Sequence, residues 1–222
     1  MPTAICLLSG GLDSCVCAAL AAQAGNRLAF LHVNYGQRTE ARELRAFHEI
    51  ADHYDVTERL VTDIQHLKRL GGSALTQMDI SVPTDRSPAA GVPVTYVPFR
   101  NANILSIAVS WAELLEAATI FMGAVELDVP YPDCRQEFFE AFNEVIRTGS
   151  RRGGATRIET PLIRMTKHAI VRRGVELEAP LHLTWSCYQN GDLACGVCDS
   201  CFQRLEGFRR AGVADLIPYI SS

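Results

Sequence analysis

Apolar residues along the chain alternate between short continuous runs and longer segments with helical spacing. Residues 4–8 are apolar at every position, which is typical of a strand buried on both faces of a sheet. The Ala- and Cys-rich residues 15–24 follow directly and suit a helix. Residues 27–33 predict a second strand, and residues 39–54 a helix, because their apolar positions recur between charges at helical intervals.

The same alternation continues towards the C-terminus. Further strands are predicted at 58–61 and 118–122, and further helices at 101–117, 134–146, 166–174 and 199–210. Residues 71–95 are interpreted as a loop because they hold three prolines and three glycines, and residues 147–157 as a Gly- and Arg-rich link. Strands that alternate with helices predict an α/β fold with a parallel sheet.

Length and composition narrow the class of protein. A chain of 222 residues forms one large domain, or one domain with an appendage, and we divide it at 1–180 and 181–222. A net charge of −4 gives no general electrostatic case for nucleic acid or an anionic membrane. No apolar run is long enough for a membrane span and no signal peptide is recognisable, so we expect a cytoplasmic protein.

The sequence SGGLDS at residues 9–14 lies between the first strand and the first helix. A strand-to-helix turn presents unpaired N–H groups and the positive end of a helix dipole, and Gly10 and Gly11 let an anion approach closely. The turn lacks the lysine of a Walker A loop and the spacing of a dinucleotide site. Asp13, between the hydroxyls of Ser9 and Ser14, suits a nucleotide bound with a divalent metal ion. The alternative is an ordinary helix cap.

Two more polar stretches, 34–38 and 123–135, follow predicted strands. Ligands of parallel sheets bind beyond the carboxyl ends of the strands. We therefore expect these stretches and residues 9–14 to line one crevice.

Four of the eight cysteines lie close together near the C-terminus. Cys187, Cys195, Cys198 and Cys201 have the spacing of a tetrahedral four-thiolate site, which is typical of structural zinc. An iron–sulfur cluster and a redox dithiol are the alternatives. Such a metal is expected to hold the C-terminal helix against the sheet. Three others, Cys6, Cys15 and Cys17, are interpreted as buried thiols.

The SGGLDS turn resembles the signature of the PP-loop ATP pyrophosphatases. Further motifs resemble the 7-cyano-7-deazaguanine synthase (QueC) family and follow in order along the chain: NYGQR at 34–38, GGSALT at 71–76, VPVTYVPFRN at 92–101, YPDCR at 131–135, TPL at 160–162, TWSCY at 184–188 and CGVCDSC at 195–201. The resemblance implies a Rossmann-like, adenine-nucleotide α-hydrolase-like (PP-loop) domain with a C-terminal zinc-binding segment that carries the four cysteines.

The resemblance also implies a C–N ligase of queuosine biosynthesis. Its substrates are 7-carboxy-7-deazaguanine, ammonia and ATP, and adenylated acid and amide intermediates lead to the nitrile, AMP and diphosphate. One structural zinc per chain, Mg²⁺ with the ATP, and a homodimer are expected. Free ammonia is the simpler nitrogen source, because the fold leaves no room for a glutaminase domain.

Candidate residues for nucleotide binding and catalysis follow from the same motifs. The nucleotide set comprises Leu8, Ser9, Gly10, Gly11, Leu12, Asp13, Ser14, Cys15, Val16, Cys17, Ala18, Gln37 and Arg38. The catalytic set comprises Asp13, Ser14, Arg100, Cys134 and Lys167. Lys167 is expected to bind phosphate. Arg100 suits a carboxylate or phosphate ligand, with an ion pair inside the protein as its alternative. Cys134 is a candidate for covalent capture, although direct attack by ammonia needs no thiol.

The substrate base is expected at the stretch before and within YPDCR. Glu126, Asp128 and Asp133 are candidate acceptors for its N–H groups, Tyr131 a stacking partner, and Arg135 a partner for the substrate carboxylate. The alternative is a polar loop with capping carboxylates.

Two rival functions stay open at this point. One is another PP-loop enzyme, such as a tRNA-thiolating one, for which the arginines between 147 and 157 would contact RNA. The other is a zinc-ribbon binding module with a vestigial nucleotide fold.

Overall fold

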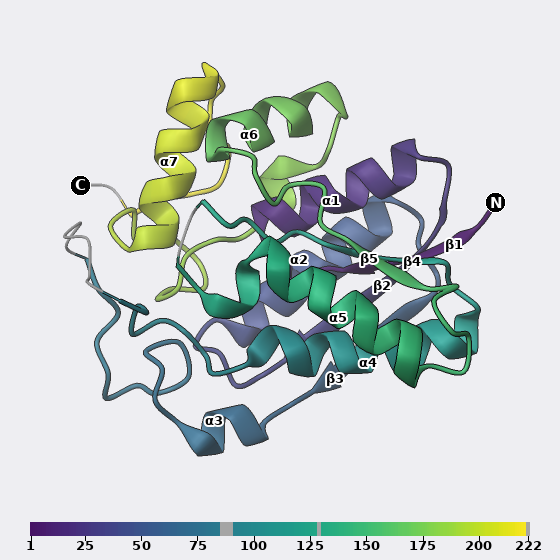
Figure 1. Ribbon diagram of the computed structural model, residues 1–222. Helices are drawn as coiled ribbons and strands as arrows, with labels where there is room; N and C mark the ends of the chain where they lie inside the picture. Colours follow the sequence, from purple (N-terminus) through teal and green to yellow (C-terminus); the bar gives the residue numbers. More distant parts are fainter. Residues whose placement is uncertain (85–90, 128–129, 221–222) are drawn as a thin grey trace.

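The computed structural model describes residues 1–84, 91–127 and 130–220. Within them, five parallel strands form one sheet in the order β3-β2-β1-β4-β5 (Figure 1). The strands are β1 (Thr3–Leu7), β2 (Arg27–Asn34), β3 (Arg59–Asp63), β4 (Thr119–Met122) and β5 (Arg157–Glu159). The predicted α/β fold with a parallel sheet is confirmed.

Helices connect these strands and continue beyond the last one. They are α1 (Leu12–Gln23), α2 (Glu40–His53), α3 (His66–Leu70), α4 (Arg100–Leu115), α5 (Gln136–Gly149), α6 (Lys167–Glu176) and α7 (Asp199–Ala211), with short 3-10 turns η1 (Pro132–Cys134) and η2 (Leu181–Leu183).

Two predicted segments differ from the structure, and one short helix was missed. The helix predicted from residue 134 begins at Gln136, because Cys134 belongs to η1. The predicted link 147–157 contains the end of α5 and the start of β5, in which Ile158 is the buried residue. The short helix α3 was not predicted, since five residues carry too little periodicity.

Side chains of the central strands alternate between two helical layers. Ile5 and Leu7 of β1 belong to a core that includes Leu105 of α4 and Phe139 of α5. Cys6 points the other way and packs with residues of α1 and α2. A strand covered on both faces must be apolar throughout, which explains the continuous run at the start of the sequence.

The strand order places the start of α1 at the reversal point of the sheet. The chain runs outwards from β1 to β2 and β3, then returns to β4 on the other side of β1. Helices leaving β1 and β4 therefore lie on opposite faces, so the connections that follow these neighbouring strands separate. Open parallel sheets bind ligands at such a point.

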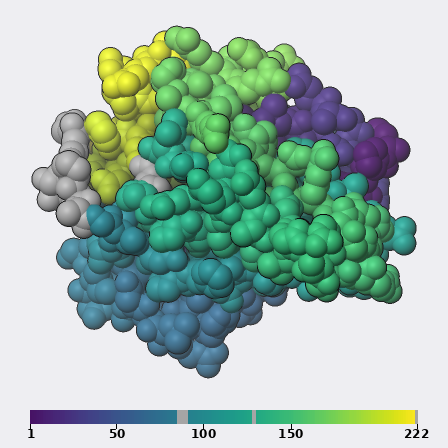
Figure 2. Space-filling view, in the orientation of Figure 1, coloured from purple at the N-terminus to yellow at the C-terminus, as the bar shows by residue number. Residues whose placement is uncertain are grey.

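The C-terminal helix does not lie on the sheet as expected. Instead, α7 packs against α6, and Phe208 joins a core with Leu12 and Val16 of α1 (Figure 1). In the space-filling view, α7 (yellow) lies beside the light green segment that contains α6 (Figure 2). The C-terminal helix α7 therefore lies on the side of the molecule where α1 begins.

A search of the described residues found no helix with the length and apolarity that crossing a membrane requires.

We predict that Leu105→Ala lowers the free energy of unfolding by about 2–5 kcal/mol, the range for deleting a buried leucine. Leu105 has no exposed surface and packs α4 on the sheet. Urea unfolding measures the change. The control, Leu114→Ala, alters a leucine of the same helix that is 80% exposed, and should shift stability by less than about 0.5 kcal/mol. Equal losses in both variants would contradict the assigned core.

Candidate active site and cysteine cluster

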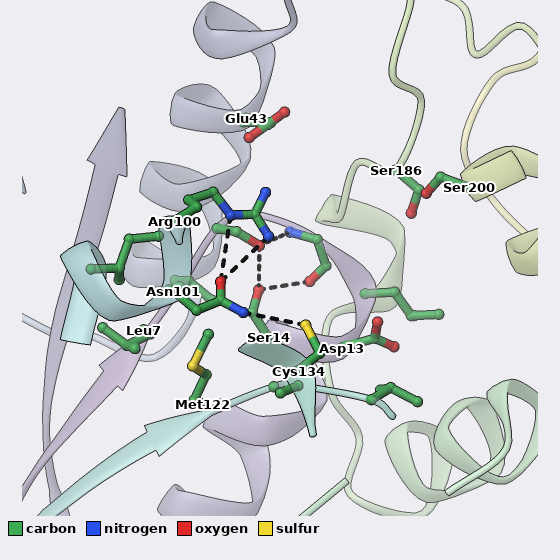
Figure 3. Close-up of a pocket in the computed structure, with 18 of the residues that line it drawn as sticks. Leu7, Asp13, Ser14, Glu43, Arg100, Asn101, Met122, Cys134, Ser186 and Ser200 are labelled. Atoms are coloured by element: carbon green, nitrogen blue, oxygen red, sulfur yellow. Dashed lines mark hydrogen bonds between the residues drawn. The ribbon is translucent and has the colours of Figure 1, made fainter. Parts of the chain in front are cut away.

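A cavity of about 280 Å³ opens at the carboxyl edge of the sheet, above the start of α1. Its walls come from the ends of β1, β2 and β4, the start of α4, the start of α6 and the segment around the cysteines (Figure 3). Residues 9–14 and 123–135 both contribute, as predicted, whereas residues 34–38 contribute Tyr35.

The SGGLDS turn presents backbone N–H groups to this cavity. The first intrahelical bond of α1 runs from the Cys15 N–H to the Gly11 carbonyl at 3.1 Å, so the preceding N–H groups have no partner within the helix. Ser14 donates its hydroxyl to the Gly11 carbonyl at 2.9 Å, and its Oγ lies 3.1 Å from that of Ser9. Hydroxyls and N–H groups thus surround one small space, which suits an anion.

Neighbouring backbone leaves no space for side chains around the turn. Gly10 has a φ of +86°, and a Cβ there would lie 2.5 Å from the Glu43 carbonyl oxygen of α2. A Cβ on Gly123, just after β4, would lie 2.8 Å from backbone atoms of Asp13 and Ser14. Glycine at both positions lets α2 and β4 support the turn directly.

Lys167 lies at the turn, although it is far from it in sequence. Its Nζ donates to both carboxylate oxygens of Asp13, at 2.8 and 2.7 Å. The lysine is the first residue of α6, and its stem passes Gly207 of α7, where a Cβ would lie 2.6 Å from the Lys167 Cγ. A cation and a carboxylate therefore meet at the mouth of the anion site.

Arg100 forms the opposite wall of the cavity (Figure 3). Its Nη1 donates to the Tyr35 hydroxyl at 3.2 Å, and its guanidinium carbon lies 5.0 Å from the centre of the Tyr35 ring. Burial raises the pKa of Tyr35 to about 12, so the hydroxyl stays protonated. In the described part of the chain, the hydrogen-bond acceptors of Arg100 are the Tyr35 hydroxyl and the Asn101 amide oxygen.

Cys134 also faces the cavity and accepts a hydrogen bond from the Asn101 amide at 3.2 Å (Figure 3). The same amide donates to the Asp133 carbonyl at 2.8 Å. Asn101 thus fixes η1 against the start of α4, and the thiol lies near the guanidinium of Arg100.

The predicted substrate residues that the structure describes separate into three groups. Tyr131 lines the cavity, and its hydroxyl lies 2.6 Å from that of Thr95. Asp133 is buried and accepts from the Asn101 N–H at 3.0 Å, which matches the capping alternative; burial raises the pKa of its carboxyl. Glu126 and Arg135 border a separate surface groove. Asp128 lies outside the described residues.

Gln37 and Arg38 make local contacts rather than facing the cavity. The Gln37 side chain accepts from the Tyr35 N–H at 2.9 Å and donates to Glu43 at 3.0 Å. Arg38 donates to three backbone carbonyls of the loop at residues 74–80. Arg38 therefore holds that loop, whereas Gln37 connects the residue after β2 to α2. The predicted nucleotide contact of both side chains stays untested.

The predicted nucleotide residues within α1 also divide by position. Leu8, Leu12 and the turn itself line the cavity. The next four residues, Cys15, Val16, Cys17 and Ala18, are buried in the packing of α1. Burial raises the pKa of Cys15 to about 12 and the pKa values of Cys6 and Cys17 above their usual value, as expected of thiols inside a core.

Several cavity residues were missed by the sequence reasoning. His32, Glu43, Ser186, Tyr188, Ser200, Gln203 and Arg204 all line it. His32 lies near the end of a predicted strand. Its Nδ1 lies 3.0 Å from the Leu8 carbonyl oxygen, and its Nε2 lies 3.0 Å from the Asn34 amide oxygen. Three of the others, Ser186, Tyr188 and Ser200, lie within the TWSCY and CGVCDSC motifs, which were the signal that could have found them.

The four C-terminal cysteines gather as predicted. Their sulfur atoms all lie within 4.8 Å of one another, and Cys195 and Cys201 are 3.9 Å apart. Sulfurs held at about 2.3 Å by a tetrahedral ion would be about 3.8 Å apart. Hydrogen bonds from the Cys198 and Cys201 thiols, with backbone N–H groups, lower the pKa of Cys187. The cluster is therefore positioned to bind a metal.

The chain matches the family model described as queuosine biosynthesis protein QueC over residues 3–212. A 7-cyano-7-deazaguanine synthase of Chloroherpeton thalassium is 51% identical over 217 residues, covering 97% of this chain and 96% of its own. The enzyme of the same name from Chlorobium phaeobacteroides is 53% identical, with the same coverage.

Among solved structures, a 4-thiouridine synthetase bound to RNA and ATP has a TM-score of 0.48 and 15% identity, over 80% of this chain and 41% of its own. A likeness of this degree supports no inference about function.

We predict that Gly123→Ala destabilises the protein by about 1–3 kcal/mol, because the new methyl group meets backbone that cannot rotate away. Chemical unfolding measures the loss. Gly149→Ala is the matched control: it also lies at the end of an element, but a Cβ there has no neighbour within 4 Å. The control should be neutral or slightly stabilising. Unchanged stability in Gly123→Ala would contradict the close support of the turn.

Proposed function

The chain belongs to the QueC family of queuosine biosynthesis proteins, and on this premise we propose how its cavity converts 7-carboxy-7-deazaguanine and ammonia to 7-cyano-7-deazaguanine. Two ATP are consumed, and AMP and diphosphate are released. The observation that carries the proposal is the SGGLDS turn at the reversal point of the sheet, with Lys167 paired to Asp13 at its mouth.

The first round replaces an oxygen of the acid by nitrogen. A carboxylate oxygen attacks the α-phosphorus of ATP, and diphosphate leaves. Ammonia then attacks the acyl carbon, and the C–O bond to AMP breaks with loss of a proton, which gives the amide. Adenylation is needed because an oxide ion is too poor a leaving group at neutral pH.

The second round removes the remaining oxygen. The amide oxygen attacks the α-phosphorus of a second ATP, and diphosphate leaves again. Loss of AMP and of the nitrogen-bound protons completes the C≡N bond. Both rounds require the same alignment of an oxygen with the α-phosphorus, so one cavity serves both.

The turn and Lys167 are assigned to the triphosphate. The first N–H groups of α1 and the hydroxyls of Ser9 and Ser14 bind phosphate oxygens, and Lys167 stabilises charge on the leaving diphosphate. Asp13 fits a role in holding Mg²⁺, because its carboxylate lies at the mouth of the anion site, where it already pairs with the ammonium group of Lys167. When bound, Mg²⁺ supplies charge neutralisation of the phosphates.

The opposite wall is assigned to the acid substrate. Arg100 faces the cavity with neutral partners, which leaves its positive charge available to orient a substrate carboxylate. Tyr131 contributes an aromatic face to the same wall. Cys134 lies within this wall as a packing and hydrogen-bonding group, since ammonia attacks an adenylate without help from a thiol.

Zinc is proposed for the cysteine cluster. Four thiolates at this spacing suit tetrahedral zinc, and a closed shell of four cysteines has no position left for a substrate. Three of the cysteines are buried in one core with Trp185 and Ile217, so the metal would join the C-terminal segment to the loop at residue 74 and to α2. Zinc there contributes to folding rather than to a chemical step.

A tRNA-thiolating enzyme is the second candidate, and only the PP-loop signature supports it. A gel shift with tRNA distinguishes this function from nitrile synthesis, because only the thiolating enzyme should bind tRNA. The homodimer implied by the resemblance and the cytoplasmic location expected from the sequence remain predictions.

The proposed reaction is tested by incubating the protein with ATP, Mg²⁺, ammonium and the carboxy-deazaguanine. Mass spectrometry should find the nitrile, with two AMP for each nitrile formed. Asp13→Asn should abolish AMP formation without unfolding the protein, because the amide keeps the size of the carboxylate but loses its charge. Asp79→Asn, at an exposed loop position, is the control and should retain full turnover. If the Asp13→Asn variant releases AMP at the normal rate, Asp13 has no role in catalysis and serves only as a helix cap.

Elemental analysis tests the metal. We expect one zinc per chain, lost in Cys201→Ser together with cooperative thermal unfolding. Cys17→Ala is the control, since this thiol is buried in α1 outside the cluster, and its zinc content should be unchanged. Iron in the purified protein, or a folded Cys201→Ser variant without metal, would refute a structural zinc site.

A further inference from the structure

Arg204 lies one helical turn beyond Cys201 on α7, and its side chain is only 1% exposed. Its guanidinium forms a bidentate ion pair with the buried carboxylate of Asp215. Nε donates to Oδ2 at 2.7 Å, and Nη2 donates to Oδ1 at 2.9 Å. Such a planar pair fixes orientation as well as distance.

The other N–H groups of Arg204 bind the segment that precedes the cysteine cluster. Nη1 donates to the Thr184 hydroxyl at 2.7 Å and to the Ser186 hydroxyl at 3.2 Å. Nη2 also donates to the Leu181 carbonyl at 3.2 Å. A guanidinium has five N–H donors, and these five bonds employ them within the described chain. Arg204 borders the cavity, but it acts on neighbouring residues.

The segment held by Arg204 is bonded to the phosphate turn. Trp185, between the two hydroxyl residues, donates its N–H to the Gly10 carbonyl at 2.8 Å. In a trans peptide the C=O and the following N–H point in opposite directions. Fixing the Gly10 carbonyl therefore fixes the Gly11 N–H, which points to the Ser9 hydroxyl at 3.2 Å, inside the turn.

We infer that Arg204 is a positioning residue for triphosphate binding. Through Thr184, Ser186 and Trp185 it holds the Gly10–Gly11 peptide so that the Gly11 N–H faces the phosphates. The inference rests on the proposed function, because it takes the SGGLDS turn as the ATP site. It gives the C-terminal segment a role in nucleotide affinity besides metal binding.

The test measures the dissociation constant of ATP by calorimetry with Mg²⁺, together with metal content and melting temperature. Arg204→Lys keeps the positive charge but cannot form the bidentate pair with Asp215. It should weaken ATP binding roughly tenfold, equivalent to about 1.4 kcal/mol, and the metal content should be unchanged. Arg210→Lys is the control: this exposed arginine of the same helix pairs with Glu206, and its replacement should leave ATP affinity unchanged.

Thr184→Val and Asp215→Asn change the partners of Arg204 and leave Arg204 itself in place. Each should weaken ATP binding by a smaller factor than Arg204→Lys. A purely structural role would lower the melting temperature without changing ATP affinity. Wild-type affinity in the folded, metal-loaded variants would overturn the inference, as would the failure of all three to fold. A wild-type chain that binds ATP but makes no nitrile contradicts the proposed function alone, whereas one that does not bind ATP contradicts both.

Discussion

The close approach of bare backbone around the first turn of α1 is the constraint on which the rest of the structure depends. The turn must present its N–H groups to a cavity, so those groups have no partner inside the helix. Support therefore comes from behind, from the α2 carbonyl beside Gly10, the chain after β4 at Gly123 and the N–H of Trp185. The first two approach closer than a side chain would allow.

This constraint explains why a C-terminal metal segment belongs to a sheet-based site. The described residues after Pro180, up to 220, form no strand of the central sheet, yet they supply the Trp185 contact and part of the cavity wall. A metal on four cysteines can fix such a segment against the rest of the fold. Arg204, paired with Asp215, connects the metal-binding helix to Thr184 and Ser186, and Trp185 between them bonds to the turn.

The sequence was most informative about features that depend on residues close together along the chain. Continuous apolar runs located the central strands, the SGGLDS turn follows from its place after one of them, and the cysteine spacing predicted a cluster that the structure confirms. Long-range contacts were not predictable. The sequence allowed a capping role for Asp133 but did not indicate that the helix it caps is α4. Nothing around Arg38 indicates that it holds backbone carbonyls of a distant loop.

The edge strand β5 and Arg204 of α7 also could not be predicted from neighbouring residues in the sequence. The strand β5 has one buried residue, Ile158, so its three residues carry no visible alternation. Arg204 lies in a helix rich in charge, where an arginine is ordinarily solvated, and only the fold brings Asp215 to it. Lys167 could be placed at the turn from the family motif, whereas its pairing with Asp13 required the structure.

The central claim is that one turn activates first a carboxylate oxygen and then an amide oxygen. Substrate labelled with ¹⁸O at both carboxylate oxygens tests this most directly, because each oxygen must leave on the phosphorus that activated it. Mass spectrometry of the products should find one ¹⁸O in every AMP and none in diphosphate. Unlabelled AMP, or label in ADP or inorganic phosphate, would contradict the account.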